Sequence, residues 1–464
     1  STALIAAALT PALTMASGYK INEQSAAGMG TAHAGRAAMA EDASVVFYNP
    51  AAMTELDRAQ FTGGFTYINA DGAFEGSSTN VVGVPSTLEG YDNGGDFLGE
   101  AFIPFMYYVR PINEKMSFGL AVFTPFGTNT DYNDTFVGGG FADETSLKSL
   151  EIQPSFAYKI NDELSVGGGI DIVYMEGLLS KQSDLIPYVP GNPLLGSAQG
   201  AESHFEVEGD DWGYGWNIGA YYKFGDDTTL GFSYRSEIEI TLEGDAELAN
   251  DGTLTFFNKD TSSLVTLGAR TQASEVPLTT PQSATFAVTH QLTDAVLLQA
   301  GTTWTGWSSF ESFDVIATEN ASGGFGDGFA DVSDLAGLGN GYEGHIEENW
   351  KDVWAASVGV TYQLNDKVAL RSGYAFDQSP VTDEYRTARV PSSDRQWLTV
   401  GAQYVLNADV SFDVAAGYLF MDTMSLNEVN KDLNNNQKEG DLSNVTGEYE
   451  IDVFSMAFQV NYKL

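Results

Sequence analysis

GYGWNIGAYYKF, residues 213–224, alternates bulky apolar side chains with small or polar ones. Trp216 and Tyr222 share one face of this stretch with its other apolar side chains, whereas Asn217 lies on the opposite face. Successive side chains of a β-strand point to opposite sides of the sheet. The stretch therefore predicts a strand with one apolar face and one small or polar face.

The same alternation recurs along the chain from Gln60 to the C-terminus. We predict about fourteen strands, an even number, as a closed up-and-down barrel with both ends on one side requires. The predicted strands are 59–70, 101–110, 116–128, 149–160, 163–177, 213–224, 228–243, 281–291, 294–306, 350–363, 366–376, 394–405, 408–421 and 448–464.

The connections between these strands alternate strictly in length. Tight turns at 161–162, 225–227, 292–293 and 364–365 alternate with long connections that are rich in Asp and Glu. Short turns at one end and long loops at the other are typical of outer-membrane barrels. A soluble sandwich or propeller is the alternative, but its loops would not be sorted in this way.

The apolar face is rich in aromatic residues, whose rings suit the headgroup level of a bilayer when they face outward. We expect this position for Trp216, Tyr222, Trp304, Trp354, Tyr362, Tyr418 and Tyr462. A soluble protein would bury these rings and expose the Gly, Ser and Asn face. We therefore predict an all-β fold, a transmembrane antiparallel β-barrel of about 14 strands.

Composition excludes several classes of protein. No window holds the roughly 18 apolar residues of a membrane-spanning helix. The net charge of −42 would repel the phosphates of nucleic acid. The chain has no cysteine, which fits an exported protein that does not depend on disulfides. The four histidines are scattered without a nucleophile–base or zinc spacing, so we expect neither catalysis nor a cofactor.

The first 58 residues do not alternate. Residues 1–16 are small and apolar and end in Thr-Met-Ala, which predicts the end of a secretory signal peptide. Residues 17–58 are crowded with Ala and Gly, and they predict a compact helical hatch that plugs the barrel formed by 59–464; an Ala-rich surface helix is the alternative. Asn49, a favoured N-cap, precedes Pro50 and Ala51, so a helix should begin there.

In order, these stretches resemble the long-chain fatty acid transporter (FadL-type) family of outer-membrane channels for hydrophobic compounds. The resemblance covers nearly the whole chain after the signal, and it is carried by SGYKINEQSAAGMGTAHAG, NPAAMTEL, TPFGTNTDYNDTFVGG, GWNIGAYYKFGDDTTLGFSYRS, PLTTPQSATFAVTHQL, ENWKDVWAASVGVTYQLNDKVALRSGYAFDQSPV and RVPSSDRQWLTVG. It implies a fourteen-stranded barrel whose hatch carries Asn49-Pro50-Ala51, a motif to which we assign a gating role. It also implies lateral release of ligand through a gap at a kinked third strand.

The third strand, 116–129, carries Pro125, Phe126 and Gly127. Proline cannot donate to a strand ladder and glycine is a weak strand former, so this is a sensible place for the wall to open. A simple strand end before a loop is the alternative.

The resemblance also implies that the connections 178–211 and 244–280 receive ligand. The first is unusually apolar for an aqueous loop, which favours a binding groove over a plain lid. Its candidate ligand-binding residues are Leu178, Leu179, Leu185, Ile186, Tyr188, Val189, Leu194 and Leu195.

Alternation places Arg235 on the luminal face together with Glu237 and Glu239. It places Arg371, on another strand, on the same face. Either arginine is a candidate for binding a substrate carboxylate, and bracing by an internal ion pair is the alternative. In the family, fatty acid members tend to carry basic residues near the end of the fifth strand. Here that position reads Tyr174-Met175-Glu176, which favours neutral hydrocarbons over carboxylates as the ligands of this protein.

One stretch resembles half of a calcium loop, with Asp432, Asn434 and Asn436 on alternate residues. The glycine and the final glutamate of such a loop are replaced by Gln437 and Ser443, so a solvated loop is the stronger interpretation and no metal is predicted.

We therefore expect a passive uptake channel for long-chain fatty acids or hydrocarbons in the Gram-negative outer membrane. Its expected partners are the hydrophobic ligand, outer-membrane lipid and lipopolysaccharide, and the barrel assembly machinery, and the protein is expected to be a monomer. An adhesin or phage receptor and a general porin are the alternative functions.

Overall fold

The computed structural model describes residues 18–79, 83, 85, 91–182, 203–250, 254–258, 263–267, 270–318, 342–431, 434, 436–437 and 442–464. The expected signal segment, residues 1–16, lies outside them. No helix within these ranges is long and apolar enough to cross a membrane.

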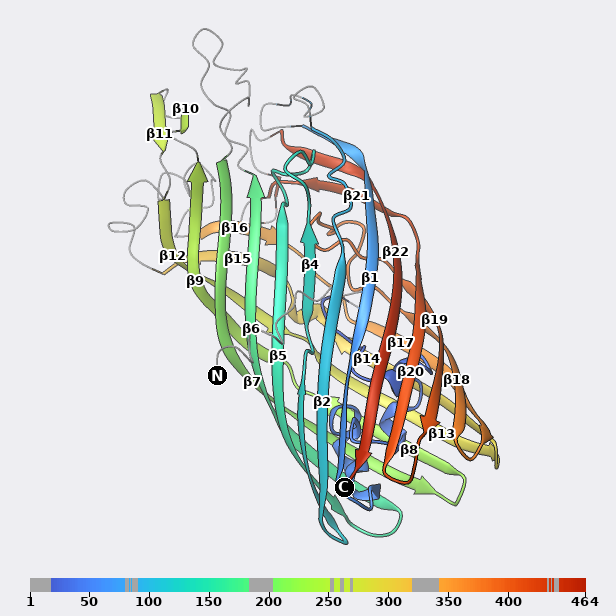
Figure 1. Ribbon diagram of the computed structural model, residues 1–464. Coiled ribbons are helices and arrows are strands. Elements are labelled where there is room, and N and C mark those ends of the chain that lie inside the picture. Colours follow the sequence, from blue (N-terminus) through green and yellow to red (C-terminus); the bar gives the residue numbers. More distant parts are fainter. Residues whose placement is uncertain are drawn as a thin grey trace.

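Pairing of the first and last strands closes the chain into a cylinder (Figure 1). β1 (Gln60–Thr79) pairs with β2 (Glu100–Asn113) on one side and with β22 (Asn444–Lys463) on the other. All pairings are antiparallel, and the result is a closed 14-strand barrel, as predicted. Closure pairs the first strand with the last, so the sheet lacks the two outer edges whose backbone groups a bilayer would leave unsatisfied.

Twenty segments make these fourteen wall strands, because six wall strands are interrupted once. Besides β1, β2 and β22, the segments of the wall are β3 (Met116–Phe123), β4 (Gly127–Asp131), β5 (Glu144–Lys159), β6 (Leu164–Gln182), β7 (Ser203–Phe224), β8 (Thr228–Arg235), β9 (Ile238–Asn250), β12 (Arg270–Thr280), β13 (Gln282–Thr293), β14 (Val296–Gly306), β15 (Ser312–Ala317), β16 (Tyr342–Glu347), β17 (Val353–Asn365), β18 (Val368–Asp377), β19 (Arg395–Val405), β20 (Val410–Met421) and β21 (Met424–Val429). Each interrupted wall strand consists of two of these segments: β3 with β4, β8 with β9, β12 with β13, β14 with β15, β16 with β17 and β20 with β21. A separate hairpin joins β10 (Leu254–Asn258) to β11 (Ser263–Leu267).

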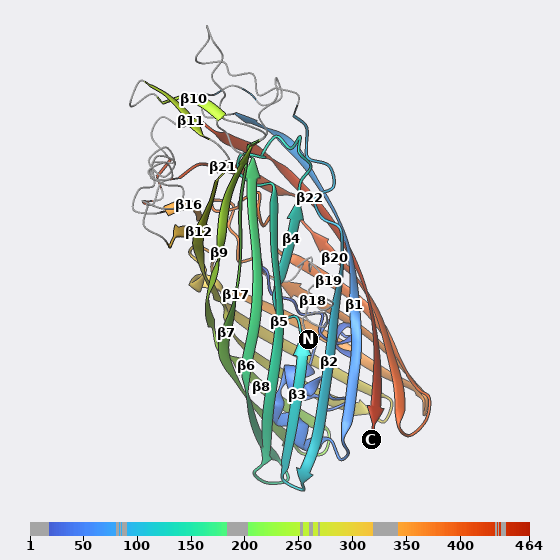
Figure 2. The ribbon, with the colours of Figure 1, turned by 60° about the vertical axis from the view of Figure 1, so that its left-hand side comes forward.

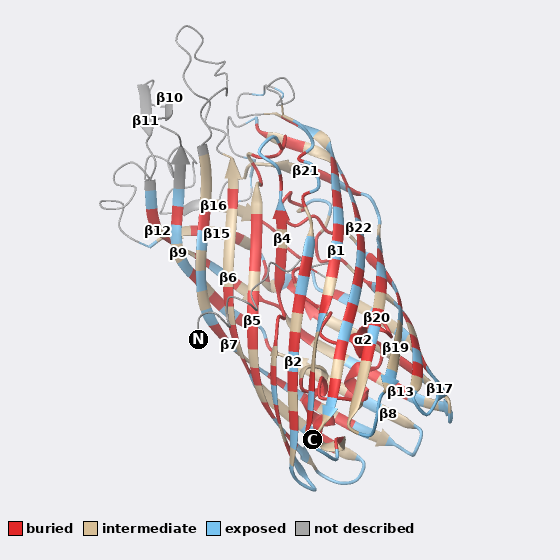
Figure 3. Cartoon of the chain, in the orientation of Figure 1, coloured by how far each residue is buried: buried red, intermediate tan, exposed pale blue. Residues whose placement is uncertain are grey.

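Buried and exposed side chains alternate along the wall (Figure 3). Trp216 is 48% exposed on the outside, whereas its neighbour Asn217 is 3% exposed inside. Of the seven aromatics expected on the outer face, six are exposed and Trp304 is half-buried. The prediction of an apolar outer face is confirmed.

The wall rises higher than predicted on one side. β6 extends to Gln182, and β7 begins at Ser203, so much of the predicted loop 178–211 is strand. β9 pairs with β12 across the predicted loop 244–280. The acidic residues of these segments suggested loops, but a strand that projects beyond the membrane can carry charge on its solvent side.

Glu237 and Glu239 do not share the luminal face with Arg235, and the prediction that they do is wrong. Both glutamates are exposed, whereas Ile238 and Ile240 are buried. Arg235 pairs with Asn217 and Glu243 pairs with Asp210, so eight residues of one strand oppose seven of the next. One extra residue between β8 and β9 reverses every side chain beyond it.

The chain before β1 folds inside the lower half of the barrel, toward the end where the C-terminus lies (Figure 1). This hatch contains α2 (Ala26–Met29), η1 (Arg36–Ala38), α3 (Val45–Tyr48) and η2 (Pro50–Glu55). The hatch backbone touches inward-facing wall glycines. A Cβ at Gly231 would lie 2.0 Å from the Ala37 carbonyl oxygen, and one at Gly373 would lie 2.1 Å from the Thr31 carbonyl carbon. Glycine is required at such points of close backbone approach.

Candidate ligand path through the barrel

The third wall strand breaks where Pro125 predicts it. β3 ends at Phe123, which pairs with Glu151, and β4 begins at Gly127, which pairs with Lys148. Four steps along the third strand therefore match three steps along β5. Figure 2 shows β4 above β3, with the break between them.

The break separates two strand edges. β2 pairs with β3 only from Met106 to Asn113, and among the described pairings its residues above Met106 pair only with β1. β4 pairs only with β5 among those same strands. Above the break, the Asp131 N–H donates to the Phe97 carbonyl at 2.9 Å, so contact resumes there. The wall thus contains a bounded region where β2 and β4 are not hydrogen-bonded to each other.

The N-terminal segment of the hatch lies behind this region. The Ile21 N–H donates to the Pro125 carbonyl at 2.8 Å, and the Gly127 N–H donates to the Tyr19 carbonyl at 2.9 Å. The Gln24 side-chain amide also donates to the Thr124 carbonyl. Backbone groups freed by the break are therefore satisfied from inside the barrel, as buried peptide groups require.

Tyr19 anchors this segment in an aromatic cluster. Its ring centroid lies 4.6 Å from that of Trp307, 5.6 Å from Phe310, 5.7 Å from Trp350 and 6.0 Å from Phe126. Its hydroxyl donates to the Thr279 carbonyl at 3.2 Å, and burial raises its pKa. The cluster exists because β14 and β16 both stop short, which turns the aromatic residues between the wall segments inward.

The aromatic cluster continues into an extended apolar lining of the upper lumen. Strands far apart in sequence contribute buried aliphatic and aromatic side chains to it. They include Leu147, Val173, Met175, Val207, Ile238, Ile240, Leu242, Val276, Leu278, Phe313, Val315, Val381 and Val390. A water-filled pore would expose polar groups at these positions.

An apolar slot lies within this lining. Its lining residues include Tyr19 from the hatch and Leu178 and Leu179 on β6. Of the eight apolar residues expected to bind ligand, these two line the slot. The other six, Leu185, Ile186, Tyr188, Val189, Leu194 and Leu195, lie outside the described residues.

A second cavity opens above the slot, at the barrel mouth. Leu179 and Val207 line both cavities. The mouth cavity adds charged side chains from the connection between β18 and β19, including Arg386 and Arg389. The sequence did not single out either arginine, although Arg389 is the first residue of the stretch RVPSSDRQW.

A third cavity, of about 150 Å³, lies between the hatch and the wall below the break. Its wall carries hydroxyl side chains such as Thr285 and Ser357, and its hatch side carries Lys20 and His33. Burial lowers the pKa of Lys20 to about 8 and that of His33 to about 3. Phe126 also lines this cavity, so the break lies between the apolar slot and a more polar space.

Arg235 contacts acidic side chains of the wall. Its guanidinium lies 2.5 Å from Glu151 and 2.9 Å from Asp171, and it donates to Gln153 at 2.9 Å. The guanidinium carbon, Cζ, also lies 5.4 Å from the ring centroid of Phe47 in the hatch. These contacts favour the bracing alternative over binding of a substrate carboxylate.

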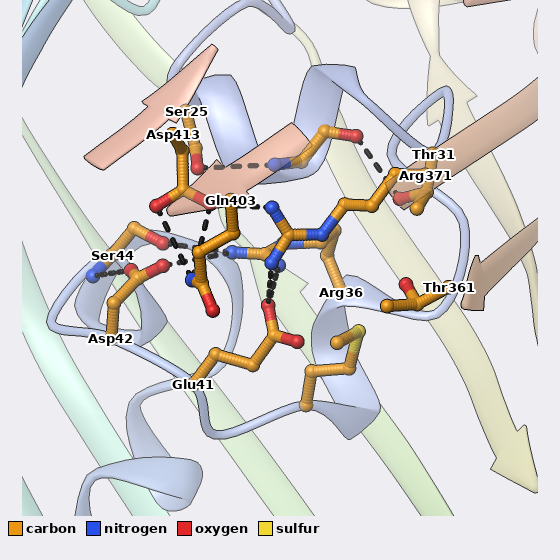
Figure 4. Close-up of polar contacts among 12 residues, drawn as sticks. Ser25, Thr31, Arg36, Glu41, Asp42, Ser44, Thr361, Arg371, Gln403 and Asp413 are labelled. Carbon is orange, nitrogen blue, oxygen red and sulfur yellow. Dashed lines mark hydrogen bonds and ion pairs between the residues drawn. The ribbon is translucent and has the colours of Figure 1, made fainter. Parts of the chain in front are cut away.

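Arg371 links the wall to the hatch (Figure 4). It pairs with Asp413 on β20 and lies 3.2 Å from Glu41, which also pairs with Arg36 at 3.1 Å. Asp42 lies 3.6 Å from Arg36. These contacts likewise favour bracing, because internal carboxylates already surround the guanidinium.

Asn49 caps a helix, as predicted. The Ala51 N–H donates to its side-chain oxygen at 3.1 Å, and Pro50 occupies the first turn of η2. The side-chain amide of Asn49 also donates to the Ala37 carbonyl at 2.6 Å and to the Ala220 carbonyl of the wall at 2.9 Å. The sequence did not predict this second role, because it depends on which strand lies opposite.

The remaining candidates lie away from the path. Asp432 lies outside the described residues, whereas Asn434 and Asn436 are exposed. Within the described part of the chain, no group of three or more His, Cys, Asp or Glu side chains is placed to hold a metal ion. Glu176, at the end of the fifth wall strand, pairs with Lys148 at 3.2 Å.

Comparison with known proteins places the chain in a family. Residues 7–464 match the family model for the outer membrane protein transport protein (OMPP1/FadL/TodX). The chain is 28% identical over 441 residues to the long-chain fatty acid transport protein of Escherichia coli (strain K12), covering 91% of this chain and 92% of the relative. It is 27% identical over 429 residues to outer membrane protein P1 of Haemophilus influenzae, covering 87% and 86%.

Solved structures share the fold. A Pseudomonas aeruginosa FadL homologue superimposes with a TM-score of 0.80 at 24% identity, covering 96% of this chain and 99% of that one. The Ralstonia pickettii toluene transporter TbuX gives a TM-score of 0.63 at 17% identity, covering 96% and 99%. The chain therefore belongs to the outer membrane protein transport protein (OMPP1/FadL/TodX) family and is a β-barrel of the Gram-negative outer membrane.

Proposed function

We propose that this protein is a passive uptake channel for hydrophobic small molecules, such as long-chain fatty acids or hydrocarbons. The names of its relatives support this ligand class, since they include a long-chain fatty acid transport protein and a toluene transporter. The observation that carries the proposal is the apolar lining of the upper lumen, which runs from Leu179 and Val207 beside the mouth cavity to Tyr19 and Phe126 at the break.

In this proposal, ligand enters at the mouth, moves down the slot and leaves sideways between β2 and β4. Tyr19 and Phe126 stand between the slot and the break, so displacement of the N-terminal segment is the step that opens the exit. Two backbone hydrogen bonds join that segment to the edges of the break, and such bonds contribute only about 0.5–1.5 kcal/mol each. The Gln24 amide and the packing of Tyr19 in its aromatic cluster must be displaced as well. A concentration gradient is a sufficient driving force.

A general porin is a weaker candidate. The hatch lies in the lower lumen and the upper lumen is apolar, whereas a porin needs a wet, open pore. An adhesin or phage receptor would depend on the long loops and would leave the buried path without a role. Lipopolysaccharide around the wall, delivery by the barrel assembly machinery and a monomeric state are part of the same proposal.

The test is to make the third strand regular. Replacing Pro125 with Thr and Gly127 with Val restores a donor and a strong strand former at the break. We expect lower cellular accumulation of radiolabelled hexadecanoate, with unchanged binding to the purified barrel. Asn129→Thr, which alters β4 at a position that lines none of the three cavities, is the control.

Unchanged accumulation by a correctly inserted double variant would contradict lateral release. Loss of both binding and accumulation would place the break within the binding site instead.

A further inference from the structure

The connection between β18 and β19, residues 378–394, folds into the upper lumen, and we call it the strap. Residues 386–392 at its tip are all buried. The tip contacts β4 and β5, which lie on the opposite side of the fourteen-strand barrel from β18 and β19. The strap therefore crosses the lumen above the break.

Hydrogen bonds dock the tip of the strap on this far wall. The Thr130 hydroxyl on β4 donates to the Arg389 carbonyl at 3.0 Å. The Tyr132 hydroxyl, just past β4, donates to the Ala388 carbonyl at 2.7 Å. Arg389 donates in turn to the Thr145 hydroxyl on β5 at 3.2 Å. Among the described pairings, no strap residue belongs to a strand ladder, so side-chain contacts hold the tip in place.

The strap lies between the mouth cavity and the apolar slot. Its residues Tyr385 and Arg386 line the mouth cavity, whereas its Val390 lines the slot. Leu179 and Val207 of the wall line both cavities, so the two spaces meet beside the strap. A ligand that moves from the mouth into the slot must pass this segment.

The slot is too small for a hydrophobic ligand while the strap is docked. Its volume is about 30 Å³, whereas an apolar cavity that binds benzene has a volume of about 150 Å³. Its described lining residues lie on wall strands, except for Tyr19 of the hatch and Val390 of the strap. The wall strands are fixed by their ladders, so displacement of Tyr19 or Val390 is the way to widen the slot.

The strap is built to move as one unit. The hydroxyls of Ser379 and Ser392 lie 2.8 Å apart and hold its two ends together. Pro380 and Pro391 restrict the backbone beside this contact. A compact loop with neighbouring ends is an Ω-loop, a class that frequently carries function. Its tip can leave the far wall while its base stays on β18 and β19.

We propose that the strap is an entrance gate, which undocks from β4 and β5 and withdraws Val390 so that ligand enters the slot from the mouth cavity. This inference rests on the proposed function, and it adds a gate distinct from the N-terminal segment of the hatch. Val390 closes the slot toward the mouth, and Tyr19 closes it toward the break. Gating loops of this kind commonly control access to an enclosed site.

The first test locks the tip of the strap to the wall. The chain has no cysteine, so Thr130→Cys combined with Arg389→Cys introduces a single pair at the docking contact. When this pair is oxidised to a disulfide, the variant should lose most of its accumulation of radiolabelled hexadecanoate and most of its binding to the purified barrel. The reduced form of the same variant is the control for the substitutions, and oxidant-treated wild type is the control for the oxidant.

The second test loosens the tip and also decides the matter if the double variant does not insert. The Thr387 hydroxyl donates to Glu348, outside the strap, at 3.2 Å. Thr387→Val removes this bond and should raise the initial rate of accumulation about two- to tenfold, as the loss of one neutral hydrogen bond implies. Thr382→Val is the matched control, because the Thr382 hydroxyl has no hydrogen-bond partner among the described residues and lines neither upper cavity.

Equal accumulation by the oxidised and reduced forms would overturn the gate and leave the proposed function standing. Lower accumulation with unchanged binding in the oxidised form would also overturn it, because the lock would then act at the exit. A rate in Thr387→Val no higher than that in Thr382→Val would show that the strap does not limit entry. Failure of wild type to take up hexadecanoate would overturn the proposed function as well.

Discussion

Asn49 shows how one side chain can combine local and long-range roles. Its oxygen caps η2, while its amide ties the hatch to Ala37 and to Ala220 in the wall. Losing the cap alone costs about 0.5–2 kcal/mol, which is small beside the barrel but comparable to the few kcal/mol that separate two conformers of a gate.

We therefore expect Asn49→Ala to insert normally and to change accumulation of hexadecanoate several-fold, with little effect on small polar solutes. Asn49→Ser keeps a capping oxygen but loses both amide donors, so it separates the two roles. Accumulation equal to wild type in both variants would show that Asn49 has no part in gating.

We expect Glu23 to make hatch packing dependent on pH. It is 1% exposed, one carboxyl oxygen has no partner, and burial raises its pKa from 4.5 to about 7. A raised pKa in the folded state means that stability is fully present below the unfolded value and is lost as pH rises through about 7. Deprotonation of Glu23 should therefore loosen the hatch.

This prediction is testable because the chain has no cysteine. In Ala27→Cys, alkylation of the buried thiol should increase more on passing from below to above pH 7 than it does in Ala27→Cys combined with Glu23→Gln. Thiolate formation contributes equally to both variants. Identical pH profiles would mean that Glu23 does not control hatch packing.

At the scale of elements, the hatch and the wall fit through glycine. A Cβ at Gly373 would lie 2.1 Å from the hatch backbone at Thr31, which is closer than any real contact, whereas at Gly301 the nearest atom would lie at 3.5 Å. Both glycines belong to wall strands beside the hatch, so they form a matched pair.

We expect Gly373→Ala to displace the hatch and Gly301→Ala to leave it in place. Trypsin should cleave after Arg36 faster in the first variant, since Arg36 is 5% exposed in the native hatch. The released fragments can be identified by mass spectrometry. Equal protection in both variants would show that the hatch adjusts without cost.

At the scale of the whole molecule, a few charges tie hatch to wall. Glu41 lies 3.2 Å from Arg371, and Glu55 pairs with Lys159 at 3.2 Å and with Lys223. Removing the glutamates leaves the buried Arg371 and the partly buried Lys159 and Lys223 with fewer compensating charges, which weakens the closed state more than loss of an exposed pair would.

Glu41→Gln combined with Glu55→Gln should therefore increase the frequency of ion-conducting openings in planar bilayers, relative to a nearly closed wild type. Arg58→Gln is the control, because the Arg58–Asp409 pair is exposed. Conductance that is identical in all three proteins would mean that packing alone holds the hatch.

The sequence by itself determined the barrel, its outward face, the start of η2 and the break at Pro125. Each follows from local geometry: side-chain direction alternates along any strand, Asn and Pro favour a helix start, and proline cannot join a ladder. These properties do not depend on which strands are neighbours.

Only the tertiary structure decided the rest, because pairing register and neighbours are set by contacts between distant residues. One extra residue between β8 and β9 moved Glu237 outward, and the carboxylates around Arg235 come from two other strands. The apolar lining gathers residues from Tyr19 to Val390. Arg389 is buried against β5 and β6, where it donates to the Thr145 hydroxyl and the Ser180 carbonyl, and these neighbours depend on the whole fold.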